Sequence, residues 1–340
     1  MLHDSWFIHP GGVSVSDQIL SGGLWVFCEQ TPGGVHSVAF ELLGQASCLA
    51  AEMRCRVTAV LVGGDGGSAS SLAAAGADSV LLAEGPDPLQ PDELQYTSVL
   101  AGLVRRYEPA VLLLGATAFG RSFAPRLAAR LETGLTADCT ALSVDPETGL
   151  LRQTRPAFGG NLMATIVCPE YRPQMATVRP KVFPAPVPDP GKSWTLVRES
   201  FPAGPQSFEW LGCISSAEET DIGKADVLVA VGQGIGGADN IALAEELVRK
   251  LHGTLASSRP LVDNGIMPYP RQVGQTGKTV SPKLYLALGI SGAIQHMAGV
   301  AAKTLVAVNT DPDAPICGYA DYVVPCDCGS FLRAMLDLLA

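Results

Sequence analysis

Short apolar runs alternate with segments of helical periodicity from Leu24 onward. Each run is bounded by Gly, Pro or Asp, which is typical of buried strands. These strands are predicted over Leu24–Cys28, Arg56–Gly63, Ser79–Leu82 and Pro109–Gly115. The segments between them predict helices over Val35–Met53, Ser70–Ala75, Pro91–Tyr107 and Arg121–Glu132. Strands that alternate with helices form a mostly parallel sheet covered on both faces, and we expect that architecture here.

The pattern changes after Thr133, where strand-like runs follow one another without helical segments. These runs are Ala137–Val144, Leu150–Thr154, Leu162–Cys168 and Gln174–Val178. They predict an antiparallel extension spanning Ala137–Val178. Its apolar strand edges would promote aggregation if they were exposed, so we expect a partner chain to cover them.

A proline-rich segment then separates two units of the chain. Prolines at every second position between Pro184 and Pro190 exclude a helix or a central strand and favour an extended linker. The predicted organisation is an extension (1–23), a first α/β domain (24–183), a linker (184–208) and a C-terminal domain (209–340). In the last, strands such as Asp226–Val231 again alternate with helices. We therefore expect two α/β domains, each with a mostly parallel sheet covered by helices, and a doubly wound C-terminal domain.

Composition and charge exclude several classes of protein. The 33 acidic and 23 basic residues leave a net charge of −10, which argues against a basic nucleic-acid surface. No apolar run approaches the roughly 20 residues of a membrane-spanning helix. Nine cysteines without a CxxC pair argue against zinc and favour a reducing compartment. Because residues 1–23 contain no Lys or Arg, we expect no leader peptide and a cytoplasmic location.

Three motifs of the C-terminal domain resemble enzyme signatures but are incomplete. Gly232–Gly237 fits GxGxxG, yet no acid follows at the distance at which an NAD-binding fold grips the ribose. Gly274–Thr279 resembles a P-loop, but position 272 is Gln instead of Gly. Ser291 is followed directly by Gly292, so it does not form a nucleophile elbow. NAD-dependent, NTP-dependent and hydrolytic activities are thus disfavoured.

Several polar loops lie at or just beyond the carboxyl ends of predicted strands. They are Ser257–Arg259, Gln275–Thr276, Ser291–His296 and Asn309. In open α/β sheets ligands bind at that edge, where glycines let the backbone approach a diphosphate. The loops together suggest a nucleotide cofactor other than NAD or ATP; the alternative is a set of ordinary turns.

At these residues the sequence resembles the alpha subunit of electron transfer flavoprotein. The resemblance rests on Val273–Pro282, Leu284–Gly299, Val306–Asn309 and Asp311–Ile316, and in the first domain on Gly115–Arg121, Arg155–Asn161 and Gln174–Pro180. It covers the chain from about Leu24 to the end. The form of Arg155–Asn161 is most similar to members from anaerobes, some of which bifurcate electrons.

The resemblance implies FAD held by the C-terminal domain and a heterodimer with a beta subunit. Ser258 and Arg259 match positions beside the isoalloxazine, and Thr276 matches the residue near flavin N5. The remaining matches are Val273, Gly274 and Gln275 in the flavin loop, Ser291, Gly292, Ala293, Ile294, Gln295 and His296 along the diphosphate and the pyrimidine edge, and Asn309 and Asp327 on the adenosine side. Gln233 stands where the family usually has Arg, which removes one cationic contact.

The resemblance further implies electron exchange with a flavin-containing dehydrogenase, which we expect to act on acyl-CoA thioesters, and no nucleic-acid or membrane partner. A guanidinium about 4 Å from reduced flavin contributes roughly 4 kcal/mol at an effective dielectric near 20, so Arg259 could shift a potential by roughly 0.1 to 0.2 V. Two other hypotheses stay open. One is an assembly subunit that binds a nucleotide without redox function, and the other, which the incomplete GxGxxG disfavours, is an NAD-dependent oxidoreductase.

Overall fold

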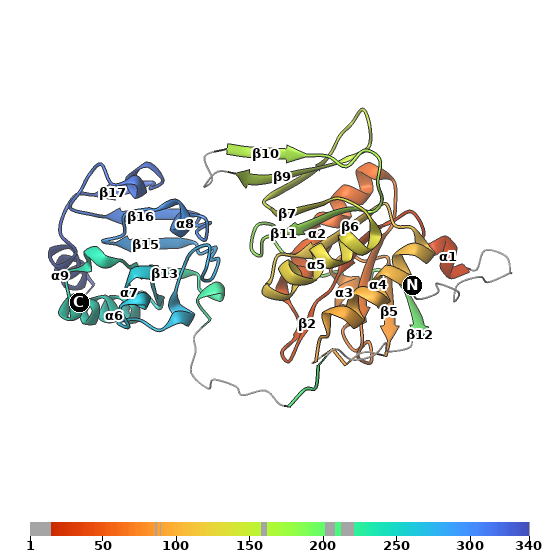
Figure 1. The fold of residues 1–340 in the computed structure, drawn as a ribbon, viewed down its shortest axis with the longest axis horizontal. Coiled ribbons are helices and arrows are strands. Elements are labelled where there is room, and N and C mark those ends of the chain that lie inside the picture. The colour runs from red at the N-terminus through yellow and green to blue at the C-terminus, as the bar shows by residue number, and fades with distance from the viewer. Residues whose placement is uncertain are drawn as a thin grey trace. The chain divides into compact units, whose positions relative to one another are not determined.

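The computed structural model describes residues 15–85, 87–88, 90–157, 162–200, 208–211 and 221–339. The chain divides into two compact units (Figure 1). The first comprises residues 1–155 and 164–211, and the second comprises residues 212–340 together with residues 156–163. Most of the predicted extension, residues 1–14, lies outside the described residues. Its last part forms α1 (Val15–Leu20), and the Leu20 carbonyl accepts a hydrogen bond from buried Trp25 Nε1 at 3.1 Å.

In the described part of the first unit, seven strands form one sheet in the order β12-β5-β4-β1-β6-β11-β7, and every neighbouring pair is parallel. The strands are β1 (Leu24–Phe27), β4 (Val57–Val62), β5 (Ser79–Glu84), β6 (Val111–Gly115), β7 (Leu135–Cys139), β11 (Gln174–Val178) and β12 (Thr195–Ser200). A short hairpin, β2 (Gln30–Thr31) and β3 (Gly34–Val35), follows β1. The predicted parallel sheet is confirmed.

Helices cover both faces of this sheet. Side chains of α2 (Ser37–Met53) and α3 (Ala69–Ala74) pack in one hydrophobic cluster with Leu24 and Val26 of β1. Those of α4 (Glu93–Tyr107) and α5 (Ala118–Leu131) pack in a second cluster with the alternate residues, Trp25 and Phe27. The two sets of β1 side chains point to opposite faces of the sheet, because successive side chains of a strand alternate between its two faces.

The predicted antiparallel extension is smaller than expected. Only β8 (Ala141–Val144), β9 (Leu151–Ala157) and β10 (Leu162–Ile166) form a separate sheet, in which β8 and β9 are antiparallel. β11, by contrast, lies inside the main sheet between β6 and β7 and is parallel to both. The start of the predicted run Ala137–Val144 likewise belongs to β7 of the main sheet. All five of its residues are buried, and a strand buried on both faces belongs in a parallel sheet.

The described part of the predicted linker is packed against the first unit. β12 pairs with β5 along six residues, and the backbone N–H of Asp189 donates to Ala74 at 2.8 Å. Lys192 forms an ion pair with Asp78 at 2.9 Å. Alternate prolines exclude helix but leave an extended chain able to lie across a helix and add an edge strand. We call residues 184–192 the proline strap. The predicted linker, residues 184–208, does not begin at residue 184, because residues 184–200 belong to the first unit.

The C-terminal unit contains, in its described part, a five-stranded parallel sheet in the order β14-β13-β15-β16-β17. Its strands are β13 (Val227–Val231), β14 (Thr254–Ser257), β15 (Leu284–Leu288), β16 (Thr304–Val308) and β17 (Tyr322–Val324). Its helices are α6 (Ala238–Lys250), α7 (Arg259–Asp263), α8 (Ile294–Met297) and α9 (Cys328–Leu338), with 3-10 turns η2 (Ile222–Lys224), η3 (Gln233–Ile235), η4 (Tyr269–Arg271) and η5 (Pro315–Gly318).

This strand order reverses direction between β13 and β15. The chain runs from β13 outward to β14, then returns to the other side of β13 and continues through β15, β16 and β17. Ligands of doubly wound sheets bind at such a switch point, beyond the carboxyl ends of the strands. None of the helices in the described ranges is long and apolar enough to cross a membrane.

The proline strap generates a stability prediction. A Cβ at Gly44 of α2 would lie 3.0 Å from Cδ of Pro186, so Gly44→Leu would overpack this contact. We expect it to lower the free energy of unfolding of the first unit by about 1–3 kcal/mol, measured by urea titration followed by circular dichroism. In a Pro186→Ala background the cost should shrink, because the clashing ring atoms are gone. An equal cost in both backgrounds would show that the strap does not contact α2 in solution.

Candidate functional site

Two glycine loops meet at the carboxyl ends of β13 and β15. Gly232 directly follows β13, and Gly289, with a φ of +63°, directly follows β15. The backbone N–H of Gly234 donates to the Gly289 carbonyl at 2.9 Å, and a Cβ on Gly232 would lie 2.3 Å from that oxygen. Only glycines permit this backbone contact, which forms the bottom of the pocket at the switch point. We call this contact the floor of the pocket.

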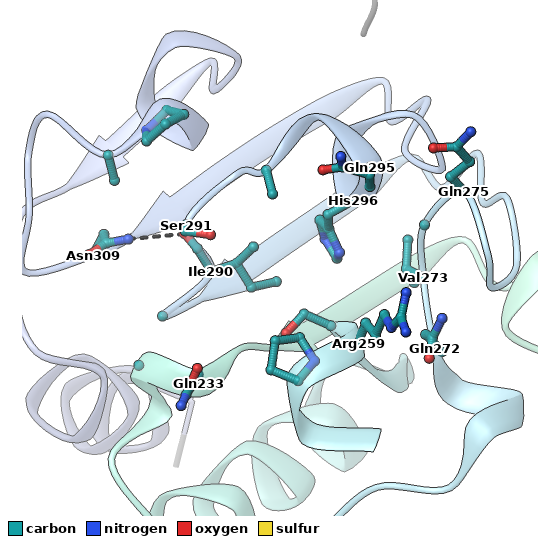
Figure 2. Close-up of a pocket in the computed structure, with 18 of the residues that line it drawn as sticks. Gln233, Arg259, Gln272, Val273, Gln275, Ile290, Ser291, Gln295, His296 and Asn309 are labelled. Atoms are coloured by element: carbon teal, nitrogen blue, oxygen red, sulfur yellow. Dashed lines mark hydrogen bonds between the residues drawn. The ribbon is translucent and has the colours of Figure 1, made fainter. Parts of the chain in front are cut away.

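A pocket of about 610 Å³ opens at this point, within the range typical of small-molecule and cofactor sites. Figure 2 shows residues from separate loops of the C-terminal unit around it, with His296 directed down from α8 and Arg259 rising from α7. Twelve of the fifteen predicted site residues line the pocket: Gln233, Ser258, Arg259, Val273, Gly274, Gln275, Thr276, Ser291, Ala293, Gln295, His296 and Asn309.

Three predicted residues lie outside the lining. Gly292 has a φ of +85°, and a Cβ there would lie 2.3 Å from the Ile316 backbone nitrogen, so it lets the Ser291 loop pack against η5. The Ile294 side chain is exposed. Asp327 caps α9 by accepting a hydrogen bond from the Ser330 N–H at 2.8 Å.

The sequence analysis missed several residues that line the pocket. These are Gly234, Pro260, Gln272, Gly289, Ile290, Asp311, Ala314 and Pro315. Gln272 had a recognisable signal, since it directly precedes the predicted flavin loop. The others depend on how the loops fold back over one another, which strand and helix periodicity does not encode.

The loop after η4 is held against α8 by backbone contacts. The N–H of Gln275 donates to the Gln295 carbonyl at 2.7 Å, and Gly274 adopts a φ of +139°. A Cβ on Gly299 would lie 2.5 Å from the Gly274 nitrogen. These glycines let residues 273–277 lie on the segment that carries His296, so the two predicted flavin-contacting segments share one wall of the pocket.

The Thr276 hydroxyl is oriented by a buried amide. Gln272 is 3% exposed, and its Nε2 donates to Thr276 Oγ1 at 3.1 Å. Because a hydroxyl that accepts one hydrogen bond keeps its own proton for another acceptor, Thr276 can donate to a ligand.

His296 is a neutral imidazole with one unsatisfied nitrogen. Its side chain is buried, and Nε2 lies 2.9 Å from the hydroxyl of buried Tyr285. Burial lowers the pKa of His296 to about 4, and a contact with the Val273 backbone, which falls short of hydrogen-bond geometry, opposes this more weakly. No described residue gives Nδ1 a hydrogen bond of acceptable geometry. A buried polar atom without a partner is costly, so this nitrogen is suited to a ligand.

Arg259 is the only Lys or Arg among the described lining residues, and Asp311 is the only carboxylate. The Arg259 side chain is 64% exposed and forms an ion pair with Asp263 at 3.2 Å. On another wall, Asn309 Nδ2 donates to the Ile290 carbonyl at 3.0 Å (Figure 2). Gln233 lies beside the glycine contact, where its amide can donate to a ligand but adds no charge.

This lining suits a flavin nucleotide. It combines the unpartnered Nδ1 of His296, the Thr276 proton, one guanidinium and glycine backbone close to the switch point, whereas general acid–base chemistry would need paired titratable groups. In the described ranges no cluster of three His, Cys, Asp or Glu side chains could hold a metal ion. The described lining is compatible with a bound cofactor.

Comparison with known proteins agrees with this chemistry. The family model of the electron transfer flavoprotein domain matches residues 24–203. The family model of the electron transfer flavoprotein FAD-binding domain matches residues 221–301, which include most of the pocket lining. The cofactor of this chain is therefore FAD.

Curated relatives match over nearly their whole length. Protein FixB of Clostridium saccharobutylicum is 44% identical over 92% of this chain and 95% of its own. The electron transfer flavoprotein subunit alpha of Thermoanaerobacterium thermosaccharolyticum is 44% identical over 92% of this chain and 96% of its own. The acryloyl-CoA reductase electron transfer subunit beta of Anaerotignum propionicum is 38% identical over 93% of this chain and 95% of its own. By these matches the chain belongs to the electron transfer flavoprotein family, as an alpha subunit with an FAD-binding domain.

Proposed function

We propose that this alpha subunit pairs with a beta subunit in the cytoplasm and passes electrons between its FAD and a flavin-containing dehydrogenase that acts on acyl-CoA thioesters. The observation that carries the proposal is the pocket itself. It presents hydrogen-bond donors and one cation to a flavin but lacks paired acid and base groups among its described lining residues. Bound FAD supplies the electron-transfer chemistry, and this chain's residues bind, orient and tune it.

An exposed apolar strand supports the beta-subunit partner. The side chains of Leu162 and Met163 on β10 are 58% and 54% exposed, and Ile166 and Val167 at its end are also exposed. β10 forms one edge of its three-stranded sheet. An apolar edge strand favours association, and a second chain covering it removes the aggregation risk.

The name of one relative supports the acyl-CoA class of dehydrogenase. The Anaerotignum propionicum protein is an electron transfer subunit of an acryloyl-CoA reductase. The similarity of Arg155–Asn161 to relatives from anaerobes extends the proposal to electron bifurcation, which needs a second flavin on the partner chain. Residues 158–161 of that segment lie outside the described residues.

The proposal is tested on this chain co-expressed with a beta-type chain from the same organism. We expect a yellow heterodimer in which this chain accounts for one tightly bound FAD, and whose flavin absorbance bleaches when an acyl-CoA dehydrogenase and its substrate are added. Light scattering and flavin extraction measure mass and stoichiometry. A colourless heterodimer would favour the non-redox assembly subunit, and a stable monomer with full electron transfer would contradict the partner.

A matched pair of surface variants tests the β10 interface in the same preparation. Met163→Glu places a charge on β10 and should weaken heterodimer formation at least tenfold, since burying an unpaired charge is costly. Val187→Glu on the proline strap, where the valine is 91% exposed, should leave association unchanged. Equal association for both variants would show that β10 is not the interface.

A second prediction concerns Arg259. Reduction places negative charge on the flavin, so Arg259→Gln should lower the midpoint potential while FAD is partly retained. For a guanidinium about 4 Å from the flavin charge, the shift in potential is roughly 50 mV at the dielectric constant of water and roughly 200 mV at an effective dielectric of 20. The exposure of Arg259 favours the lower value. Asp263→Asn, which frees the guanidinium, should shift the potential the opposite way. An unchanged midpoint in Arg259→Gln would leave Arg259 as a surface ion pair only.

A third prediction separates cofactor contacts from structural roles. Thr276→Ala and His296→Ala should each shift the flavin spectrum and midpoint. Thr276→Ala should leave the thermal unfolding of the cofactor-free protein nearly unchanged, whereas His296→Ala should lower the unfolding temperature, because it leaves the buried Tyr285 hydroxyl without its partner. Because the His296 pKa is about 4, its contribution to the midpoint should not titrate between pH 6 and 8. Wild-type potential and FAD affinity in both variants would rule out a flavin with N5 near Thr276 and its pyrimidine edge near His296. Loss of folding in either variant would indicate a structural role.

A further inference from the structure

Tyr285 is buried outside the pocket lining, and its hydroxyl is hydrogen-bonded to one lining residue, His296. It belongs to β15, its side chain is 0% exposed, and it is not among the lining residues. Its hydroxyl lies 2.9 Å from Nε2 of His296, and the two rings meet nearly edge to face with centroids 6.2 Å apart. No other described residue forms a hydrogen bond with this hydroxyl.

Two arrangements of the proton between these groups are conceivable. If His296 donated from Nε2, the buried Tyr285 proton would have no acceptor, and Nδ1 would carry an unprotonated lone pair. If Tyr285 donates to Nε2, the Tyr285 proton and Nε2 are both satisfied, and the neutral ring carries its single proton on Nδ1, which is then the one group left for a ligand. The second arrangement leaves fewer buried groups unsatisfied and costs less free energy.

Burial of Tyr285 reinforces the second arrangement. Desolvation raises the pKa of the Tyr285 hydroxyl far above its usual range, so it stays protonated and able to donate. Since the helix that carries His296 is only four residues long, the ring needs an anchor from a stiffer element. The central strand β15, flanked by β13 and β16, supplies it.

We propose that Tyr285 is a positioning residue that holds His296 in the tautomer protonated on Nδ1, so that the ring presents a fixed hydrogen-bond donor to the bound cofactor. The inference rests on the proposed flavin site. A donor at the pyrimidine edge favours the reduced flavin, which is negatively charged there. Tyr285 therefore biases the potential without touching the cofactor, as an outer hydrogen bond fixes the tautomer of a metal-bound histidine.

The tautomer can be measured directly by NMR on protein with ¹⁵N-labelled histidine, with and without FAD. The chain has only five histidines, and His296→Asn identifies the signals of interest. Wild-type protein should show His296 protonated on Nδ1 and unprotonated on Nε2 in both states. In Tyr285→Phe, which removes only the hydroxyl, the ring should populate the Nε2-protonated form in the cofactor-free protein.

The same variant should change the redox equilibrium in a manner that a packing defect would not. We expect Tyr285→Phe to weaken binding of reduced FAD about tenfold more than binding of oxidised FAD, which corresponds to about 30 mV for a two-electron couple. The matched control is Tyr107→Phe, which removes a tyrosine hydroxyl equally buried in the first unit. It should leave both the tautomer and the potential unchanged.

Each outcome has a separate meaning. Nε2-protonated His296 in the wild-type protein, or an unaltered tautomer in Tyr285→Phe, would overturn the positioning role even if FAD binds as proposed. If the tautomer is as expected but Tyr285→Phe has the same midpoint potential as the wild-type protein, the link between Tyr285 and the cofactor is overturned. Failure to bind FAD would count against the proposed function alone. It would not bear on the positioning role, because the tautomer is measured in the cofactor-free protein.

Discussion

The backbone contact between the loops after β13 and β15 is the constraint on which the FAD site depends. Gly234 and Gly289 approach to a 2.9 Å hydrogen bond, and a side chain on Gly232 would collide with the same carbonyl. The contact closes the floor of the switch point and thereby places Gln233 on one side and Ile290–Ser291 on the other. A larger residue at these positions would separate the loops and open the floor.

Above this floor the site relies more on neutral donors than on charge. Thr276 is oriented by Gln272, and His296 by Tyr285, each through a partner that is itself buried. The only cation in the described lining is largely solvated, and Gln233 adds none where the family usually has Arg. Fixed donors aimed at a flavin alter its preference between redox states without moving during the reaction, which suits a protein whose role is to pass electrons.

Much of this structure could be predicted from the sequence, and the failures have physical reasons. Alternating apolar runs identified the parallel sheets, and polar loops after strands brought Ser258, Thr276 and His296 to one pocket. β11 was assigned to the wrong sheet because an apolar strand does not reveal which neighbours it pairs with. The proline strap was predicted as part of an extended linker, and its packing on the first unit was not, because composition shows what a segment cannot form and not what it packs against. Tyr285 escaped notice because a buried strand tyrosine looks like any core residue.

The central claim is that FAD occupies the β13/β15 switch point in one orientation, and a crystal structure of the FAD-loaded protein tests it most directly. The account predicts the isoalloxazine between Arg259 and the Val273–Thr276 loop, its N5 facing Thr276 and its pyrimidine edge facing His296 Nδ1, with the diphosphate along Ser291. A ring turned so that His296 faces the dimethylbenzene edge, or an FAD bound elsewhere in the C-terminal unit, would contradict it.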